Sequence, residues 1–298
     1  MTTVEVFAPA KINLTLHITG QRADGYHLID SLVAFAPVGD TLRLSRADEP
    51  ALAVDGPQAD GVPQDASNLV WRAAQTVPGV GPVSIHLTKH LPAAAGIGGG
   101  SSDAAAALRG CWALEQGAEA AGQKARTFED DGEIRRLGAD IPMCVYPTTL
   151  RARGIGEDIT PVPIPPVPAV LINPRVPVST PSVFAALESK TNPAMVDPLP
   201  VFETAPTLID WLRSQRNDLE PPARRIAPVI DTVLHSLSGT PGCALARMSG
   251  SGATCFGLYD SDRAAQAAHD RLAEAHPDWW IASGSLGDMS DRAMPRLS

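Results

Sequence analysis

The chain has 298 residues, 44% of them hydrophobic, and a formal net charge of −9 at pH 7. A chain of this length can bury the core of one large or two medium domains, and its negative charge argues against a broad surface for nucleic acid or for an anionic membrane. The four cysteines lie far apart and form no C-x-x-C pair, which argues against a disulfide scaffold and a zinc site; they are Cys111, Cys144, Cys243 and Cys255.

Alternating apolar side chains predict a first strand over residues 11–18. Apolar residues at even positions from Ile12 to Ile18 alternate with polar residues from Lys11 to His17, so the polar side chains should share one face. A turn is expected at 23–25, and Asn68 or Ser67 is expected to cap a helix within 65–74. Further strands are predicted at 32–35, 41–44, 83–87 and 143–146, and further helices at 102–114 and 127–137.

A proline-rich segment at 160–168 cannot form a helix and fits a semi-rigid crossing between domains. We therefore expect an N-terminal domain over residues 1–162 and a C-terminal domain over 163–298. Strands mixed with helices, without a regular βαβ rhythm, predict an α+β fold. The C-terminal half should contain strands at 169–172 and 279–282, helices at 181–187, around 209–212, after 217–220 and at 264–276, a hairpin of 245–248 with 254–258, and a loose polar tail from 284.

The most informative segment is a glycine loop, residues 92–102, that runs directly into an alanine-rich helix. Four glycines between Gly96 and Gly100 let the backbone approach a ligand closely. The helix start beyond them presents unpaired N–H groups and a partial positive charge, which together favour a phosphate chain. The loop does not fit the P-loop, which ends in Gly-Lys-Ser/Thr. It does not fit the dinucleotide fingerprint either, because position 101 is Ser where the third glycine should stand. The alternative is a flexible linker that happens to precede a helix.

His86 and His90 are four residues apart and could be a metal pair. Within a strand, however, they would lie at different heights, so surface histidines are the better interpretation. Apart from Ser102 as a candidate, no metal ligand can be identified from the sequence.

Three segments resemble the motifs of the GHMP kinase superfamily: residues 9–14, 96–102 and 248–254. Residues 20–27, 138–142 and 217–220 are similar to those of one family within it, the kinases that phosphorylate the 2-hydroxyl of cytidine-diphosphate methylerythritol in non-mevalonate isoprenoid biosynthesis. The resemblance covers residues 6–258, and Gly25-Tyr26-His27 is its most specific part. It implies a two-domain architecture, with a ferredoxin-like C-terminal domain and the active site in the cleft between the domains.

The resemblance also implies the co-substrate. ATP should occupy the glycine loop, with Mg²⁺ implied by the triphosphate. Phosphoryl transfer needs an aligned hydroxyl, a held triphosphate and neutralised charge, which main-chain amides and a helix dipole can supply without a Walker lysine. The expected ATP-binding residues are Pro92, Ala93, Ala94, Ala95, Gly96, Ile97, Gly98, Gly99, Gly100, Ser101 and Ser102.

Asp140 and Lys11 are the candidate catalytic residues. Asp140 could accept the proton of the acceptor hydroxyl, and the alternative is that it caps a neighbouring turn. A lysine beside it would stabilise the ionised carboxylate and the incoming negative charge, and the alternative for Lys11 is a solvated surface side chain.

The candidate substrate-binding residues are Asn13, Tyr26, His27, Thr180 and Phe184. An aromatic ring can stack on a base and a histidine can read its edge, and the family resemblance assigns Tyr26 and His27 to the cytosine. For Phe184 the alternative is an ordinary helix-core position. The 249–254 turn should lie close to the phosphates and support the glycine loop.

Two features depart from the family pattern. Ala93–Ala95 stand where glycines are usual, so the start of the loop should be stiffer and its contact with adenine different. Pro147-Thr148 replaces a usual Gly-Gly, and Arg151 and Arg153 are unusually basic nearby, which leaves the local strand geometry open.

Other functions remain open at this point: another GHMP kinase acting on mevalonate, homoserine or a sugar, a nucleotide-binding regulator without activity, or an RNA-associated protein. The presence of both Lys11 and Asp140 argues against a pure binder, and the charge of −9 argues against the last. With no signal peptide and no apolar run of membrane-spanning length, we expect a cytoplasmic protein that binds neither nucleic acid nor membrane.

Overall fold

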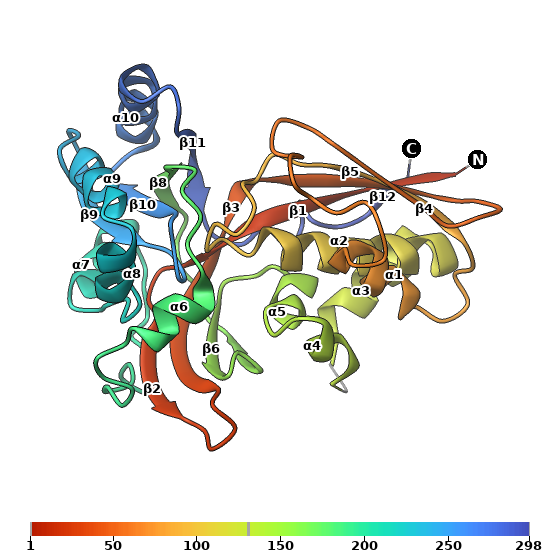
Figure 1. The fold of residues 1–298 in the computed structure, drawn as a ribbon, viewed down its shortest axis with the longest axis horizontal. Coiled ribbons are helices and arrows are strands. Elements are labelled where there is room, and N and C mark those ends of the chain that lie inside the picture. Colours follow the sequence, from red (N-terminus) through yellow and green to blue (C-terminus); the bar gives the residue numbers. More distant parts are fainter. Residues whose placement is uncertain (1, 130–131, 298) are drawn as a thin grey trace.

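The computed structural model describes residues 2–129 and 132–297. It contains two sheets that lie side by side, the first built mainly from the N-terminal half and the second from the C-terminal half (Figure 1). Helices and antiparallel strands are mixed without βαβ repetition, and the predicted α+β class is confirmed. Within the described residues, no helix is both long enough and apolar enough to cross a membrane.

The first sheet has the order β12-β1-β3-β5-β4, and β2, β6 and β7 extend it along the other end of β3. β4 and β5 are parallel, and the other pairs are antiparallel. The strands are β1 (Thr3–Asn13), β2 (His17–Gln21), β3 (His27–Arg46), β4 (Ala51–Asp55), β5 (Val83–Thr88), β6 (Leu150–Gly154), β7 (Asp158–Pro161) and β12 (Arg296–Leu297).

The two short strands predicted at 32–35 and 41–44 are parts of one 20-residue strand, β3. Pro37 and Gly39 between them suggest a break, but β3 continues through them beside an irregularity in its pairing with β1. A Cβ at Gly39 would lie 2.2 Å from the Ala8 carbonyl oxygen, so this glycine permits the close approach of the two strands.

The strand predicted at 11–18 is wrong in one respect, because β1 ends at Asn13 and β2 begins at His17. The main-chain N–H groups of Leu14 and Thr15 both donate to the Leu32 carbonyl, and Leu16 forms an isolated β-bridge with Asn217. The predicted polar face from Lys11 to His17 is buried. It does not face water because the C-terminal half of the chain covers it.

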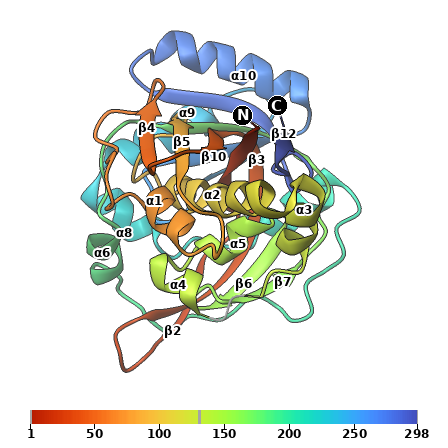
Figure 2. The ribbon, with the colours of Figure 1, turned by 90° about the vertical axis from the view of Figure 1, so that its right-hand side faces the viewer.

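Helices α1 to α5 cover one face of the first sheet (Figures 1 and 2). The long helix α2 packs along β1 and β3 and buries its alanine face, Ala104–Ala107, completely. Asn68 caps α1 by accepting a hydrogen bond from the Val70 N–H at 2.9 Å, as expected. These helices are α1 (Leu69–Gln75), α2 (Gly99–Gln116), α3 (Ala118–Arg126), α4 (Glu133–Leu137) and α5 (Ile141–Val145).

Two predictions in this region are wrong. The helix predicted at 127–137 is helical only over α4, since α3 ends at Arg126; residues 130 and 131 lie outside the described part of the chain. The strand predicted at 143–146 belongs mostly to helix α5. Pro142 stands in the first turn of α5, where its fixed φ favours a helix, and a short apolar run does not distinguish helix from strand.

The second sheet is antiparallel with the order β11-β8-β10-β9, and the predicted hairpin is β9–β10. α10 packs along β8 and β11, and α9 packs along β9 and β10. Its strands are β8 (Val167–Asn173), β9 (Cys243–Met248), β10 (Cys255–Tyr259) and β11 (Trp280–Leu286), and its helices are α6 (Thr180–Ala185), α7 (Ala205–Arg213), α8 (Glu220–Ile226), α9 (Val229–Ser238) and α10 (Asp262–Ala275).

The C-terminal tail, expected to be loose, returns to the first sheet, so that expectation is wrong. Gly287 exchanges two main-chain hydrogen bonds with Phe35, and β12 pairs with β1. The fully buried guanidinium of Arg109 donates to the Ala293 carbonyl in the tail and to the Phe7 carbonyl in β1. Burial lowers the pKa of Arg109 to about 10. The tail is therefore held by a side chain whose role no local pattern reveals.

Candidate active site

A cavity of about 730 Å³ lies where the two halves of the chain meet. We call its wall at 94–96 and 98–101 the loop end, and its wall at Tyr26, His27 and Phe184 the aromatic end. Lys11, Asn13, Asp140, Thr180 and Ser251 also line it. Of the eighteen predicted site residues, fourteen line this one cavity, and they include both catalytic candidates and all five substrate-binding candidates.

The loop end is built from main chain. Helix α2 begins at Gly99, immediately after Gly98 with φ +63°, so the N–H groups of its first turn, which have no partner within the helix, lie at the cavity wall. Gly96 has φ +73°, and a Cβ there would lie 2.6 Å from the Ser249 carbonyl oxygen. Only glycine fits this path, and the result is a cradle with positive partial charge.

Four of the predicted loop residues lie off the cavity. Ile97 is fully buried in the apolar core, and the buried Ser102 hydroxyl donates to the Pro9 carbonyl at 2.7 Å, which removes it as a candidate metal ligand. Pro92 and Ala93 line a neighbouring cavity of about 260 Å³, which Ala94 shares with the main one. Ala94 has φ +48°, so it takes a left-handed conformation that glycine would adopt with less strain.

Lys11 and Asp140 form an ion pair, with 2.7 Å between Lys11 Nζ and Asp140 Oδ2. Lys11 is 5% exposed, so it is not a solvated surface lysine. Its main-chain N–H donates to the Ile97 carbonyl at 2.9 Å, which fixes the strand against the glycine loop. Asp140 directly precedes α5, but its carboxylate does not cap that helix. The alternatives considered for both residues are therefore not observed.

At the aromatic end, Tyr26 and His27 stand at the tip of the β2–β3 hairpin and Phe184 lies on α6. The His27 and Phe184 rings stack, with 4.8 Å between centroids and 29° between planes. Tyr26 is 61% exposed. Burial, and secondly the positive charge of Lys190, lowers the pKa of His27. Its buried Nε2 finds no hydrogen-bond partner within the described residues, so it is free to bind a ligand.

Asn13 and Thr180 lie between the two ends. The Asn13 side-chain amide donates to the Ser31 hydroxyl at 2.8 Å, whereas its Oδ1 is buried and has no partner among the residues described. The Thr180 hydroxyl is 2.7 Å from that of Ser251. Both residues thus present polar atoms where a ligand could span the cavity.

The 249–254 turn lies against the glycine loop, as expected. The Ser249 hydroxyl accepts from the Asn13 N–H and donates to the Gly96 carbonyl, each at 3.1 Å. The Thr254 N–H donates to the Ala95 carbonyl at 3.2 Å. The C-terminal half therefore holds both the first strand and the loop.

A buried cluster that the sequence analysis missed lies behind the loop. Lys89 Nζ bonds to Asp40 and, at 2.6 Å, to Asp103 in α2. Burial, and then repulsion from Asp40, raises the pKa of Asp103 well above its ordinary value. Burial lowers the pKa of Lys89, but the two carboxylates outweigh it and the net shift is upward. The position of Lys89 just before the loop is the one sequence signal that could have revealed this cluster.

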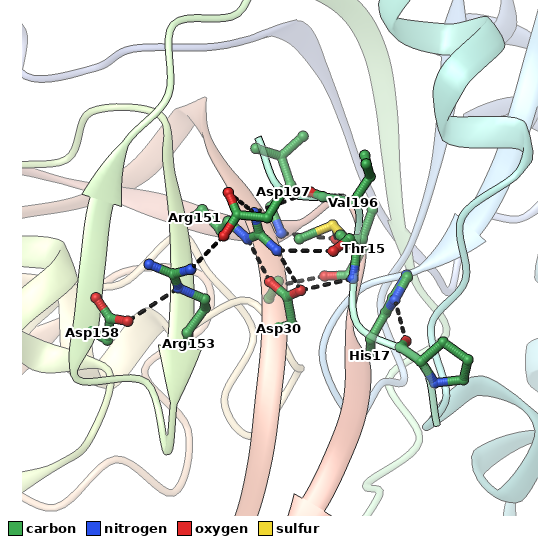
Figure 3. Close-up of polar contacts among 12 residues, drawn as sticks. Thr15, His17, Asp30, Arg151, Arg153, Asp158, Val196 and Asp197 are labelled. Atoms are coloured by element: carbon green, nitrogen blue, oxygen red, sulfur yellow. Dashed lines mark hydrogen bonds and ion pairs between the residues drawn. The ribbon is translucent and has the colours of Figure 1, made fainter. Parts of the chain in front are cut away.

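Arg151 and Arg153 do not disturb their strand, because each has acidic partners (Figure 3). Arg151 reaches from β6 to Asp30 on β3 and forms two hydrogen bonds of 2.7 Å. Asp30 also accepts a hydrogen bond from the Met195 N–H at 2.8 Å, which holds the segment before α7 against β3. Arg153 lies between Asp158 and Asp197. The sequence analysis noted the two arginines but not their partners.

The histidine pair is not a metal site in the described residues. His86 pairs with Asp55 at 2.9 Å, and His90 is exposed. No group of three His, Cys, Asp or Glu side chains within 2–129 and 132–297 could hold a metal ion.

Comparison with known proteins identifies the family. The model for the GHMP kinases N terminal domain matches residues 68–147, and the model for GHMP kinases C terminal matches residues 204–278. A 4-diphosphocytidyl-2-C-methyl-D-erythritol kinase from Roseobacter denitrificans is 53% identical over 296 residues, covering 99% of this chain and 97% of its own. The chain belongs to this family of GHMP kinases.

Other members of the family are similarly close. The Dinoroseobacter shibae relative of the same name is 57% identical over 277 residues, which cover 93% of this chain and 92% of its own. A crystal structure of 4-(cytidine 5'-diphospho)-2C-methyl-D-erythritol kinase has a TM-score of 0.76 at 34% identity and covers 95% of this chain and 99% of its own. A homoserine kinase from Cytophaga hutchinsonii, with a TM-score of 0.66 at 18% identity, shares the fold.

Proposed function

We propose that the chain transfers the γ-phosphoryl group of ATP to the 2-hydroxyl of 4-(cytidine 5'-diphospho)-2-C-methyl-D-erythritol. The acceptor oxygen forms a bond to the γ-phosphorus as the bond from that phosphorus to the β–γ bridging oxygen breaks. ADP leaves with that oxygen, and the hydroxyl proton passes to a base. Because the protein does little covalent chemistry in such a transfer, alignment and charge stabilisation should supply most of the catalysis.

The loop end would hold the triphosphate. Its first-turn amides and the dipole of α2 provide a local positive potential on a chain whose net charge is −9. The neighbouring cavity of about 260 Å³ continues from Ala94, Gly99 and Gly100 toward Asn68 and Leu69. We place the adenine there, because this cavity is contiguous with the loop and partly apolar.

Mg²⁺ would arrive with the triphosphate. Among the described residues that line the main cavity, Asp140 is the one carboxylate. Such a sparse donor set fits an ion that takes its other ligands from phosphate oxygens and water. Bound there, it would neutralise charge on the phosphates.

Asp140 would accept the proton of the acceptor hydroxyl. Its carboxylate is 38% exposed, so a ligand in the cavity can reach it, while the 2.7 Å contact with Lys11 fixes its orientation. General-base assistance of this kind is worth about 10²- to 10⁴-fold. Lys11 would also stabilise negative charge that develops on the transferred group, because it lies directly against Gly98 of the loop.

The aromatic end would hold the cytosine. Tyr26 and Phe184 offer ring faces for stacking, and the unpartnered Nε2 of His27 can bond to the base edge. Asn13 Oδ1, also unpartnered, could accept from a hydroxyl of the sugar alcohol. Thr180 completes the wall between the base and the phosphates.

The observation that carries the proposal is the Lys11–Asp140 pair between a main-chain cradle and a base-sized aromatic end. The test is a panel in which the purified protein receives ATP and Mg²⁺ with this substrate, mevalonate, homoserine or a sugar. We expect ADP and a 2-phosphate product with the cytidine compound alone. Turnover of another acceptor instead would make the chain a different GHMP kinase, and ATP binding without turnover of any acceptor would favour the regulator.

A further inference from the structure

The segment Asn217–Glu220 lies between the loop end and the aromatic end. Leu16 donates from its N–H to the Arg216 carbonyl at 2.9 Å, and its own carbonyl accepts from the Asp218 N–H at 2.8 Å. A piece of the C-terminal half thereby pairs with the main chain between β1 and β2. Neither Asn217 nor Asp218 is among the residues that line the cavity, although their neighbours Leu16 and Leu219 are.

Asn217 holds the turn behind the glycine loop. Its side-chain amide donates to the carbonyls of Met248 and Gly250, each at 2.8 Å. These two carbonyls flank Ser249, whose hydroxyl bonds to the Gly96 carbonyl. Asn217 is 5% exposed, so removing its amide would leave two buried acceptors without partners. Its contacts therefore fix the support of the loop end.

Asp218, the next residue, holds the hairpin that carries the aromatic end. Its Oδ2 accepts from the Ile18 N–H at 2.7 Å and from the Asn192 side chain at 3.1 Å. Its Oδ1 accepts from Arg216 Nε at 2.6 Å. Ile18 belongs to β2, which leads to the turn with Tyr26, so the carboxylate fixes the base of that hairpin.

The two neighbouring side chains therefore have different partners: Asn217 bonds to the turn that supports the loop end, and Asp218 bonds to the hairpin that carries the aromatic end. We propose that Asn217 and Asp218 are positioning residues with separate tasks: Asn217 aligns the loop that receives ATP, and Asp218 aligns the hairpin that receives the acceptor. The inference rests on the proposed function. It assigns a task to two residues that do not line the cavity.

The test compares Asn217→Ser with Asp218→Asn in steady-state kinetics. Loss of one buried hydrogen bond of this kind should weaken binding of the affected ligand about tenfold. Asn217→Ser should raise the KM for ATP about tenfold and leave the KM for the acceptor within about twofold. Asp218→Asn should raise the KM for the acceptor about tenfold and leave the KM for ATP within about twofold. Asp210→Asn, an exposed carboxylate paired with Arg213 on α7, is the matched control and should change neither.

Calorimetric titration with an unreactive ATP analogue, in the absence of acceptor, gives a second measurement. Asn217→Ser should weaken this binding and Asp218→Asn should not. If Asn217→Ser does not fold, Asn217→Asp keeps the oxygen that accepts from the Leu219 N–H at 2.9 Å and removes the amide that donates to Met248 and Gly250, so it should show the same selective loss. Equal changes in both KM values, or a lower melting temperature with both KM values unchanged, would overturn the inference.

Failure of the proposed function has a different signature. In that case the unsubstituted protein would not phosphorylate the cytidine compound at all. The titration with the ATP analogue would still decide whether Asn217 positions the loop.

Discussion

At the loop end the cavity wall is main chain, from Gly96 to the first turn of α2, whereas at the aromatic end it consists of side chains from two separate elements. The shape of the loop end is set by the path of the backbone, so a Cβ added at Gly96 would displace it. The aromatic end depends on ring faces and one imidazole nitrogen. One cavity can therefore fix one ligand through backbone geometry and the other through side-chain chemistry.

The largest expected effect is at Asp140, where the two ends meet. Asp140→Asn keeps the shape of the side chain but removes the proton acceptor, so turnover should fall by about 10²- to 10⁴-fold. Affinity for ATP measured without Mg²⁺ should remain, because the loop end does not use this side chain. Turnover by rapid quench and ATP binding by calorimetry check this, with Asp158→Asn, an exposed carboxylate on β7, as control. Unchanged turnover would remove Asp140 from its assigned role.

Gly96→Ala tests the backbone end. The new Cβ would lie 2.6 Å from the Ser249 carbonyl oxygen and 2.8 Å from the Gly252 nitrogen at φ +73°, so the loop must move. We expect the KM for ATP to rise about tenfold or more, which corresponds to ~1.4 kcal/mol.

Gly81→Ala is the matched control, because Gly81 has φ +69° with open space around it. It should lower the free energy of unfolding by about 1–2 kcal/mol through backbone strain alone and leave the KM for ATP unchanged. If Gly96→Ala behaves like this control, the close packing of the loop has no bearing on ATP binding.

Tyr26→Ala tests the side-chain end. Loss of a stacking ring should weaken acceptor binding by about 1–3 kcal/mol, with ATP binding unaffected. Val201→Ala truncates another exposed apolar side chain and should change neither affinity. Equal acceptor affinity in calorimetry for Tyr26→Ala and the unsubstituted protein would exclude this ring from the base site.

The smallest expected effect is a shift in the pH dependence of acceptor binding. Burial first, and Lys190 second, lowers the pKa of His27 from its usual 6.5. The neutral ring therefore persists as the pH falls through 6.5, and acceptor affinity should be lost only below that value, where His27 becomes protonated. Lys190→Gln removes the smaller cause, so the pKa should rise and the loss should begin at higher pH.

The KM for the acceptor, measured across the pH range, checks this shift. Lys124→Gln is the control, because Lys124 lies over Trp112 on the far helices and should not affect His27. Superimposable profiles for Lys190→Gln and the unsubstituted protein would contradict the assignment of His27.

The position of the loop end could be predicted because its signals are local, although Pro92, Ala93, Ile97 and Ser102 lie off the cavity. A run of glycines before a helix start specifies both the backbone path and the unpaired amides within about ten residues of sequence. The resemblance to GHMP kinases then added Lys11 and Asp140, which are 129 residues apart and carry no common local pattern. The catalytic roles of these two residues stay predictions until turnover is measured.

Other features could not be predicted because they depend on distant partners. Asp30 and Arg151 are 121 residues apart, and neither position alone indicates a buried pair. The short apolar run at 143–146 fits a strand or a helix equally well by periodicity, and the helix α5 is favoured by Pro142 in its first turn and by packing against α2. In the same way β3 passes through Pro37 because β1 accommodates it.

The sequence by itself determined the α+β class, the glycine loop before α2 and the hairpin turn that carries Tyr26, since each follows from patterns of residues close together in the chain. The tertiary structure alone decided which polar residues are buried and paired: Lys89 between Asp40 and Asp103, and Asn217 beneath the 249–252 turn. Burial of a polar group is stable only when distant segments supply its partners. That requirement is a property of the folded chain as a whole.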